Sequence, residues 1–259
     1  MAHIHAKKRF GQHFLHDRYV ISQIVAAFSP KPDDQVVEIG PGTGVLTRAL
    51  LEKLGHLYAV ELDRDLAARL STEFAPERFT LHSTDALKFD FCRLAPSDRK
   101  LRLIGNLPYN ISTPLLFHLL DQAACIQDML FMLQKEVVDR MCAAPGGKDY
   151  GRLSVMIQYR CAVEKLFDVA PGAFTPPPKV DSSVARLVPH ATPPVAVNDP
   201  EKFARLVQAA FTSRRKVLRN TLKGWLRAEE MQALGIDPIR RAETLSLAEF
   251  AALSNAATA

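Results

Sequence analysis

Apolar runs that alternate with amphipathic stretches dominate the first 190 residues of the chain. Short runs of mostly hydrophobic residues are typical of buried strands, and they occupy residues 35–39, 57–60, 79–82, 101–105 and 129–133. Between them, hydrophobic residues recur at the spacing of one helical face, and these stretches occupy residues 45–54, 66–74, 115–120 and 135–142. Strands that alternate with helices in this way indicate an α/β fold.

The pattern changes in the last third of the chain. Residues 163–169 and 184–188 alternate between apolar and polar side chains and are expected to be the closing strands of the sheet. A proline-containing stretch at 191–194 reads as a linker, and the residues after it show helical periodicity without a strand signal. We therefore predict two domains, one over residues 1–190 and a small, all-helical one over residues 198–259.

Composition narrows the choice of compartment and partner. The chain has 259 residues and is 47% hydrophobic, which is ample for a full core. Its net charge of +5 favours an anionic partner, and no apolar run approaches the ~20 residues of a membrane span. No two cysteines have CxxC spacing, so neither a zinc site nor a redox motif is indicated. We expect reduced, buried thiols in a cytoplasmic protein.

A glycine-rich turn follows the first apolar run. Residues 38–44 read Glu-x-Gly-x-Gly-x-Gly and lead directly into a helical pattern. A dinucleotide site would need GxGxxG, and a P-loop would need a lysine after its last glycine. This turn therefore suits a ligand without phosphate, such as an adenosine joined to an amino acid through sulfur. Glycines such as Gly40 and Gly42 would let the backbone approach that ligand closely.

Two carboxylates follow the next two apolar runs. Glu61 comes directly after the second run, where a carboxylate can accept both hydroxyls of a ribose. Asp85 comes after the third run, where it can accept a hydrogen bond from an adenine amino group. The alternatives are an ordinary surface charge for Glu61 and a loop aspartate, which is common, for Asp85.

The turn Asn106-Leu107-Pro108-Tyr109 directly follows the fourth apolar run. Pro108 fixes its own φ and disfavours helix at Leu107, so the turn is stiff. Asn106 offers a carbonyl oxygen to an amine, and Tyr109 offers a flat ring on which a base can stack. Asn-x-Pro-Tyr resembles the motif of S-adenosylmethionine (SAM) dependent methyltransferases that act on a planar amino group. A strand-end turn with a buried tyrosine is the alternative.

Basic residues gather in the tail. Six basic residues and no acid lie between residues 214 and 227. Arg215, Arg219 and Lys223 have i, i+4, i+8 spacing and are predicted to share one face of a helix. That face could bind an RNA backbone, because uncompensated like charges repel each other on a helix. A solvated helix face is the alternative. The opposite, apolar face comprises Leu218, Leu222, Trp225 and Leu226.

Two further segments have both a structural and a functional interpretation. Residues 174–182 contain three prolines and form either a stiff connector or a rim that presents Phe174 beside the substrate pocket. The basic start of the chain is either a solvated terminus or a phosphate-binding arm, and its basic residues are His3, His5, Lys7, Lys8 and Arg9.

The order of these motifs resembles the bacterial small-subunit rRNA adenine N6,N6-dimethyltransferase family over essentially the whole chain. The most specific part of the resemblance is the run from Gly105 to Pro114. It implies a Rossmann-like SAM-dependent methyltransferase domain with a small C-terminal helical domain. It also implies two methyl transfers to each of two adjacent adenosines near the 3′ end of 16S rRNA, in an immature small ribosomal subunit. We expect a monomer that needs no metal.

The resemblance also assigns site residues. It places SAM contacts at His13, Leu15, Gly40, Gly42, Glu61, Asp85 and Asn106. His13 stands where the family often has Asn, and a His can supply similar hydrogen bonds. The target amine would donate to the Asn106 side chain and the Leu107 carbonyl, which localises its lone pair. Tyr109 on one face and Phe174 on the other would hold the base.

Other functions remain open from the sequence alone. N6-adenine DNA methyltransferases and protein glutamine methyltransferases share the chemistry but usually have Pro where this chain has Leu107. The 23S rRNA adenine enzymes more often have Ile there. A non-catalytic RNA-binding assembly or transcription factor on the same fold would fail to bind SAM. A dinucleotide-dependent oxidoreductase is disfavoured by the glycine spacing.

Overall fold

The computed structural model describes residue 7 and residues 11–258. The chain forms two compact units. The first joins the chain up to residue 138 to residues 164–189, and the second joins residues 139–163 to the chain from residue 190 onward. The second unit thus contains the tail that the sequence assigns to a helical domain and adds residues 139–163 to it. The functional division into residues 1–190 and 198–259 stays a prediction.

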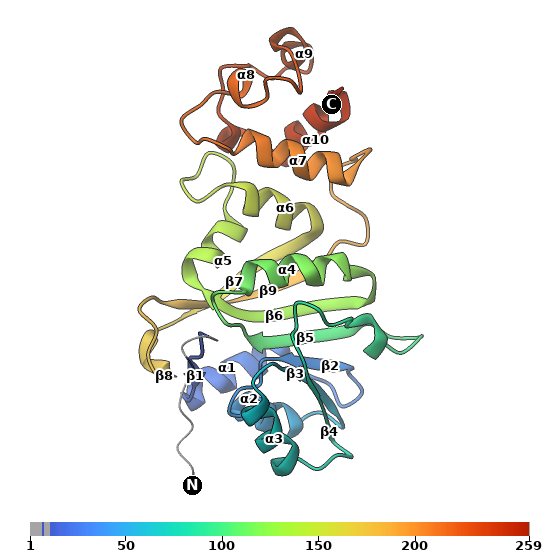
Figure 1. Cartoon of the computed structure of the whole chain (residues 1–259), viewed down its shortest axis with the longest axis vertical. Helices are drawn as coiled ribbons and strands as arrows, with labels where there is room; N and C mark the ends of the chain where they lie inside the picture. The colour runs from blue at the N-terminus through green and yellow to red at the C-terminus, as the bar shows by residue number, and fades with distance from the viewer. Residues whose placement is uncertain (1–6, 8–10, 259) are drawn as a thin grey trace. The chain divides into compact units, whose positions relative to one another are not determined.

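The first unit is built on a mixed sheet whose strands lie in the order β4-β3-β2-β5-β6-β9-β7 (Figure 1). The strands are β2 (Val36–Ile39), β3 (Leu57–Glu61), β4 (Phe79–Ser83), β5 (Leu101–Asn106), β6 (Ile126–Gln134), β7 (Cys161–Val169) and β9 (Ser182–Pro189). Those from β4 to β6 are parallel, and β9 runs antiparallel to β6. The predicted α/β class is confirmed. The central strands are continuous hydrophobic runs because both faces of a parallel sheet are buried.

Helices precede, connect and follow the parallel strands along the chain. They are α1 (Arg18–Phe28), α2 (Val45–Leu51), α3 (Arg64–Glu73), α4 (Ser112–Asp121) and α5 (Lys135–Cys142). Asp17 caps α1 by accepting hydrogen bonds from the backbone N–H groups of Tyr19 and Val20. The buried side chains of α1 recur at the spacing of one helical face and are Val20, Ile24 and Phe28.

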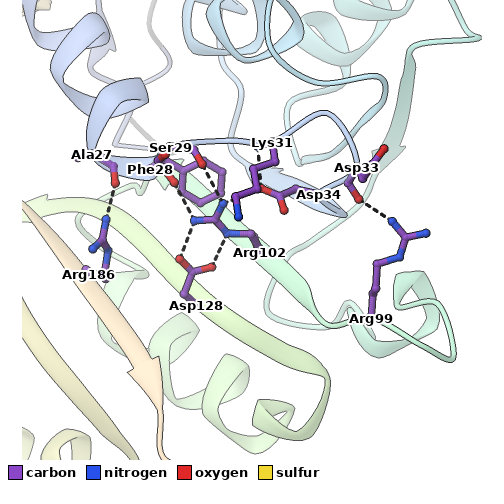
Figure 2. A network of polar contacts seen from close by, with 10 residues as sticks. All are labelled: Ala27, Phe28, Ser29, Lys31, Asp33, Asp34, Arg99, Arg102, Asp128 and Arg186. Atoms are coloured by element: carbon purple, nitrogen blue, oxygen red, sulfur yellow. Dashed lines mark hydrogen bonds and ion pairs between the residues drawn. The ribbon is translucent and has the colours of Figure 1, made fainter.

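A buried ion network holds α1 against the sheet (Figure 2). The guanidinium of Arg102 on β5 binds both carboxylate oxygens of Asp128 on β6 at 2.8 and 2.9 Å, and it binds Asp34 at 2.6 Å. The same guanidinium donates to the backbone carbonyls of Phe28 and Ser29 at the end of α1. These carbonyls have no partner within the helix, so the arginine acts as its C-terminal cap.

A second sheet of two short strands was not predicted. It pairs β1 (Phe14–Leu15) with β8 (Phe174–Thr175), and Leu15 lies opposite Phe174. This pairing places the Phe174 side chain in the hydrophobic core, where it is 2% exposed. The Phe174 ring thus packs among core residues, and its role beside the substrate pocket stays a prediction.

The cysteines differ from the expected reduced, buried thiols. Cys92 and Cys125 form a disulfide with a Cα–Cα distance of 5.4 Å, although they are 33 residues apart. Gln122 brings their segments together, because its side-chain oxygen accepts a hydrogen bond from the backbone N–H of Phe91 at 2.6 Å. Cys142 is exposed and Cys161 is buried. Sequence spacing could not reveal this proximity, which depends on the tertiary fold.

The second unit contains α6 (Arg152–Arg160), α7 (Pro200–Ala210), α8 (Leu218–Thr221), α9 (Ala228–Ala233) and α10 (Leu247–Ala256). A capping box begins the last helix, since Ser246 and Glu249 exchange backbone and side-chain hydrogen bonds. Within residues 11–258, no helix combines the length and the apolar character that a membrane span requires.

The predicted helix over residues 214–227 is wrong. Its helical part is the four-residue α8, because the backbone is extended at Val217 and left-handed at Gly224. The first N–H groups of α8 donate to the carbonyls of Arg240 and Pro238. Arg215, Arg219 and Lys223 are all exposed but do not lie along one helical face.

Two other arginines of this basic stretch, Arg214 and Arg227, have partners within the protein. Arg227 pairs with Glu230 at 2.9 Å, and the Arg214 guanidinium donates to the backbone carbonyls of Lys148 and Tyr150. The apolar residues of the stretch still pack inward: Leu218, Leu222 and Leu226 are buried and Trp225 is half-buried.

Candidate active site

A cavity of about 340 Å³ lies in the first unit, at the carboxyl ends of the parallel strands. Ligands of open α/β sheets bind at this edge. The residues that line it include nine of those predicted from the sequence, namely His13, Leu15, Gly40, Gly42, Glu61, Asp85, Asn106, Leu107 and Tyr109. Phe174 is not among its described lining residues, in keeping with its burial in the core.

The glycine-rich turn between β2 and α2 forms one wall of the cavity. Gly40, Gly42 and Gly44 have φ values of 70°, 57° and 78°, which side chains rarely allow. A Cβ on Gly42 would lie 3.2 Å from the ring of Phe14. The turn therefore needs glycine both for its backbone conformation and for the close approach of the N-terminal segment.

Glu61 ends β3 with its carboxylate held toward the glycine turn. The backbone N–H of Gly42 donates to its Oε2 at 3.1 Å, and that of Asp63 donates to its Oε1 at 2.9 Å. Burial raises the pKa of Glu61, and these backbone hydrogen bonds oppose the rise. A carboxylate has about four acceptor sites, so each oxygen can still accept a hydrogen bond from a ribose hydroxyl.

Asp85 lies in the loop after β4 and lines the same cavity. Its Oδ1 accepts a hydrogen bond from the backbone N–H of Leu87 at 3.0 Å, which forms an Asx turn and fixes the carboxylate. The loop position predicted from the sequence thus places a third carboxylate, after Glu38 and Glu61, at the cavity wall.

Glu38 on β2 is a site residue that the sequence analysis treated only as part of the glycine motif. It lines the cavity, is 2% exposed, and accepts a 2.6 Å hydrogen bond from the hydroxyl of Thr47 on α2. Burial raises its pKa to about 8, with the nearby charge of Glu61 adding to the rise. An acid just before the glycine turn was the only signal in the sequence.

The Asn106 side chain is anchored by its nitrogen. Its Nδ2 donates a 2.9 Å hydrogen bond to the backbone carbonyl of His13, while the backbone N–H of Leu107 donates to Met132 on β6. Because the amide nitrogen is used in this way, Oδ1 is the part of the side chain available to accept a hydrogen bond.

Tyr109 is half-buried at the cavity and its hydroxyl is fixed. It shares a 2.6 Å hydrogen bond with the hydroxyl of Ser182, and burial raises its pKa. The His13 ring stacks on it with ring centroids 5.6 Å apart, and His13 Nδ1 lies 2.7 Å from the carbonyl oxygen of Pro176. Ser182 and this stacking were not foreseen from the sequence.

Lys7, one residue of the predicted phosphate-binding arm, pairs with two carboxylates. Its ammonium lies 2.6 Å from Asp63 and 2.6 Å from Asp65, and Gln12 Nε2 donates to Asp63 at 3.0 Å. These contacts join the start of the chain to the turn after Glu61. His3, His5, Lys8 and Arg9, which the same prediction included, lie outside the described residues.

The charges of the cavity restrict its ligand. Its described lining residues include the carboxylates of Glu38, Glu61 and Asp85 but neither Lys nor Arg. Such a cavity suits a ligand that is cationic or donates hydrogen bonds, and it disfavours phosphate. Within the described range, no group of His, Cys, Asp and Glu side chains is arranged to hold a metal ion.

The model of the family described as ribosomal RNA adenine dimethylase matches residues 3–259. The chain belongs to this family. Members of the ribosomal RNA adenine dimethylase family use SAM. The carboxylates and the glycine turn of this cavity fit such a ligand, which has an adenosine without phosphate and a positively charged sulfur. The chain is therefore a SAM-dependent methyltransferase.

Relatives of this dimethylase match it over almost their whole length. Proteins named ribosomal RNA small subunit methyltransferase A are 57% identical in Alcanivorax borkumensis, over 96% of this chain and 89% of that protein. The one in Laribacter hongkongensis is 60% identical, over 96% and 95%. The one in Pseudomonas aeruginosa is 56% identical, over 96% and 94%.

Solved structures of dimethylases and their relatives have the same Rossmann-like fold. A dimethyladenosine transferase from Plasmodium falciparum superimposes with a TM-score of 0.77 at 26% identity, covering 93% of this chain and 96% of that one. The 23S rRNA methyltransferase ErmE superimposes with a TM-score of 0.71 at 25% identity, covering 94% and 98%. The Rossmann-like methyltransferase fold predicted from the sequence is confirmed.

Proposed function

We propose that this protein transfers methyl groups from SAM to the N6 amines of two adjacent adenosines near the 3′ end of 16S rRNA. Each adenosine receives two methyl groups during maturation of the small ribosomal subunit. The observation that carries the proposal is the anchored Asn106 amide beside Tyr109, at a cavity lined by carboxylates, in a chain of this family.

The cavity residues divide the binding of the cofactor among them. Bound SAM supplies an electrophilic methyl group on a sulfonium, so the protein needs to position it more than to activate it. Glu61 accepts hydrogen bonds from the ribose hydroxyls, and Asp85 accepts one from the adenine amino group. Gly40 and Gly42 leave room along the turn for the ligand, while His13 and Leu15 cover it from the N-terminal segment.

The turn after β5 receives the target base. The Asn106 Oδ1 and the Leu107 carbonyl accept hydrogen bonds from the N6–H groups, which localises the amine lone pair and stabilises the positive charge that develops on nitrogen. Tyr109 supplies the stacking surface, and its bond to Ser182 fixes the ring. The base must leave its RNA loop to reach this turn.

The exposed basic residues of the tail complete the proposal. Arg215, Arg219 and Lys223 bind the phosphate backbone of 16S rRNA in an immature small subunit, so residues 198–259 act as the RNA-binding part of the chain. The net charge of +5 supports an anionic partner. The protein acts as a monomer in the cytoplasm, where its substrate is assembled.

Methyl transfer to isolated ribosomal subunits tests the proposal. Labelled SAM is incubated with the protein and small subunits that lack the modification, with large subunits and duplex DNA as alternative substrates. We expect label in N6,N6-dimethyladenosine from the small subunit only. Label in the large subunit or in DNA, with none in the small subunit, would contradict the proposal.

A further inference from the structure

Glu38 is a buried carboxylate that the proposed function does not use. It sits on β2, and the strand order β3-β2-β5 places β2 between the strand that ends in Glu61 and the strand that ends in Asn106 (Figure 1). Glu38 itself lines the cavity. Glu38 therefore borders the ligand space between the ribose-binding group and the group that receives the target amine.

That space corresponds to the charged part of the cofactor. Between the ribose and the methyl acceptor, SAM carries a sulfonium, whereas the product S-adenosylhomocysteine (SAH) carries a neutral thioether. We propose that Glu38 is a specificity-determining residue that makes the site prefer the cationic cofactor over its neutral product. This inference rests on the proposed function, because it takes the ribose to be at Glu61 and the acceptor at Asn106.

Among the described residues that line the cavity, neither Lys nor Arg lies beside Glu38. Strand β3 contributes the carboxylate of Glu61, and α2 contributes the neutral hydroxyl of Thr47. From β5 the cavity receives Gly105 and Asn106, which do not titrate, and the loop after β4 contributes Asp85. With neither Lys nor Arg among the described lining residues, a ligand cation is the available counter-charge.

Proton release distinguishes the two ligands. Because burial raises the pKa of Glu38 to about 8, the carboxyl keeps its proton near neutral pH when no cation is nearby. SAM and SAH share the α-ammonium and α-carboxylate and differ in charge only at sulfur. The sulfonium favours the ionised carboxyl, so SAM binding expels more of this proton to solvent than SAH binding does. Glu61 also has a raised pKa, but the same ribose hydroxyls reach it from both ligands. The difference between the ligands therefore reports on Glu38.

Calorimetry tests the inference directly. SAM and SAH are titrated into the full-length protein in two buffers with different ionisation enthalpies, from about pH 6 to about pH 9. We expect SAM to release more protons than SAH below about pH 8, and its preference over SAH to rise with pH and then level off. In Glu38→Gln the extra release disappears, and the SAM-to-SAH affinity ratio falls by about tenfold or more.

Two further variants sharpen the test. Glu77→Gln removes an exposed glutamate and should leave both the proton release and the affinity ratio unchanged. Thr47→Val removes the hydrogen bond that favours the ionised Glu38, so the pH at which the preference levels off should rise. Equal proton release for SAM and SAH, with an unchanged ratio in Glu38→Gln, would overturn the inference and leave the proposed function intact. Failure to bind either ligand would instead contradict the proposed function.

Discussion

The side-chain amide of Asn106 donates a 2.9 Å hydrogen bond from Nδ2 to the backbone carbonyl of His13, 93 residues earlier in the chain. This bond connects the turn after β5 to the N-terminal segment that covers the cavity. It also decides which end of the amide is left for a substrate, because Oδ1 is the end that does not bind His13. A single contact thus positions both the acceptor for the target amine and the segment beside the cofactor.

Asn106→Ala is expected to lose most methyl transfer while it stays folded. Loss of one preorganised transition-state partner typically costs on the order of 100-fold or more in rate. Single-turnover methylation of small subunits measures the effect, and circular dichroism checks the fold. Asn106→Asp loses the hydrogen bond to His13 but keeps an oxygen that can accept from the target amine. Its methylation rate should therefore lie between those of the wild type and Asn106→Ala. A near-normal rate in folded Asn106→Ala would remove the catalytic role.

Glu61→Ala is expected to weaken SAM binding with a modest effect on saturated turnover. The carboxylate is 7% exposed and is already oriented by two backbone N–H groups. Losing its charge-assisted hydrogen bonds to the ribose should cost roughly 1.5–3 kcal/mol. Calorimetric titration with SAM measures this, with the exposed Glu77→Ala as the matched control. Equal SAM affinities in Glu61→Ala and the wild type would show that Glu61 does not hold the ribose.

Glu38→Gln is expected to stabilise the ligand-free protein increasingly as pH rises. The folded protein holds a proton on Glu38 up to about pH 8, whereas the unfolded chain loses it near the ordinary pKa of 4.5. The stability from this proton is therefore fully present below pH 4.5 and is lost as pH rises toward 8. Gln cannot ionise and avoids the loss, which reaches at most about 5 kcal/mol.

Thermal unfolding of both proteins across this pH range checks the prediction. The melting temperature of Glu38→Gln relative to the wild type should increase between pH 4.5 and pH 8 and then stay constant. A difference that does not change with pH would mean that Glu38 ionises normally in the folded protein.

Arg102→Met is expected to destabilise the fold by about 3–5 kcal/mol, because it leaves the buried carboxylate of Asp128 without its partner. The side chains of Arg102 and Asp128 are 10% and 12% exposed, so solvent screens this pair weakly. Urea unfolding measures the change. Arg99→Met, which removes an exposed arginine of the same network, should change stability by less than about 0.5 kcal/mol. The double variant Arg102→Met with Asp128→Leu should recover part of the loss.

Replacing Arg215, Arg219 and Lys223 together by Gln is expected to weaken binding to small subunits. The slope of log K for subunit binding against log salt concentration should become shallower by about 0.7–0.9 for each phosphate contact that is lost. SAM affinity should not change. The control replaces three exposed lysines of the first unit, Lys53, Lys88 and Lys100, by Gln. If the tail variant keeps the subunit affinity and the salt slope of the wild type, these three residues do not bind the RNA backbone.

The sequence predicted the parts of the site that depend on local pattern. Buried parallel strands are hydrophobic on both faces, so their ends could be located, and with them the positions of Glu61 and Asn106. The glycine turn was recognisable because its positive φ angles restrict the choice of residue. These features gathered in one cavity because parallel strands bring their carboxyl ends to the same edge of the sheet.

The features that were missed depend on contacts between distant segments. Phe174 is in the core because β8 pairs with β1, some 160 residues away in the chain. The helix expected over residues 214–227 begins only at Leu218, where the carbonyls of Arg240 and Pro238 accept the first N–H groups of α8. Periodicity within one segment carries no information about such partners.

The location of the transferred methyl groups tests the central claim most directly. Small subunits without the modification are incubated with SAM and the protein, and the 3′ end of 16S rRNA is excised and weighed by mass spectrometry, with Asn106→Ala in parallel. The account predicts two methyl groups on the N6 of each of two adjacent adenosines with the wild type, and almost none with the variant. Methyl groups at any other position, or equal methylation by Asn106→Ala, would contradict it.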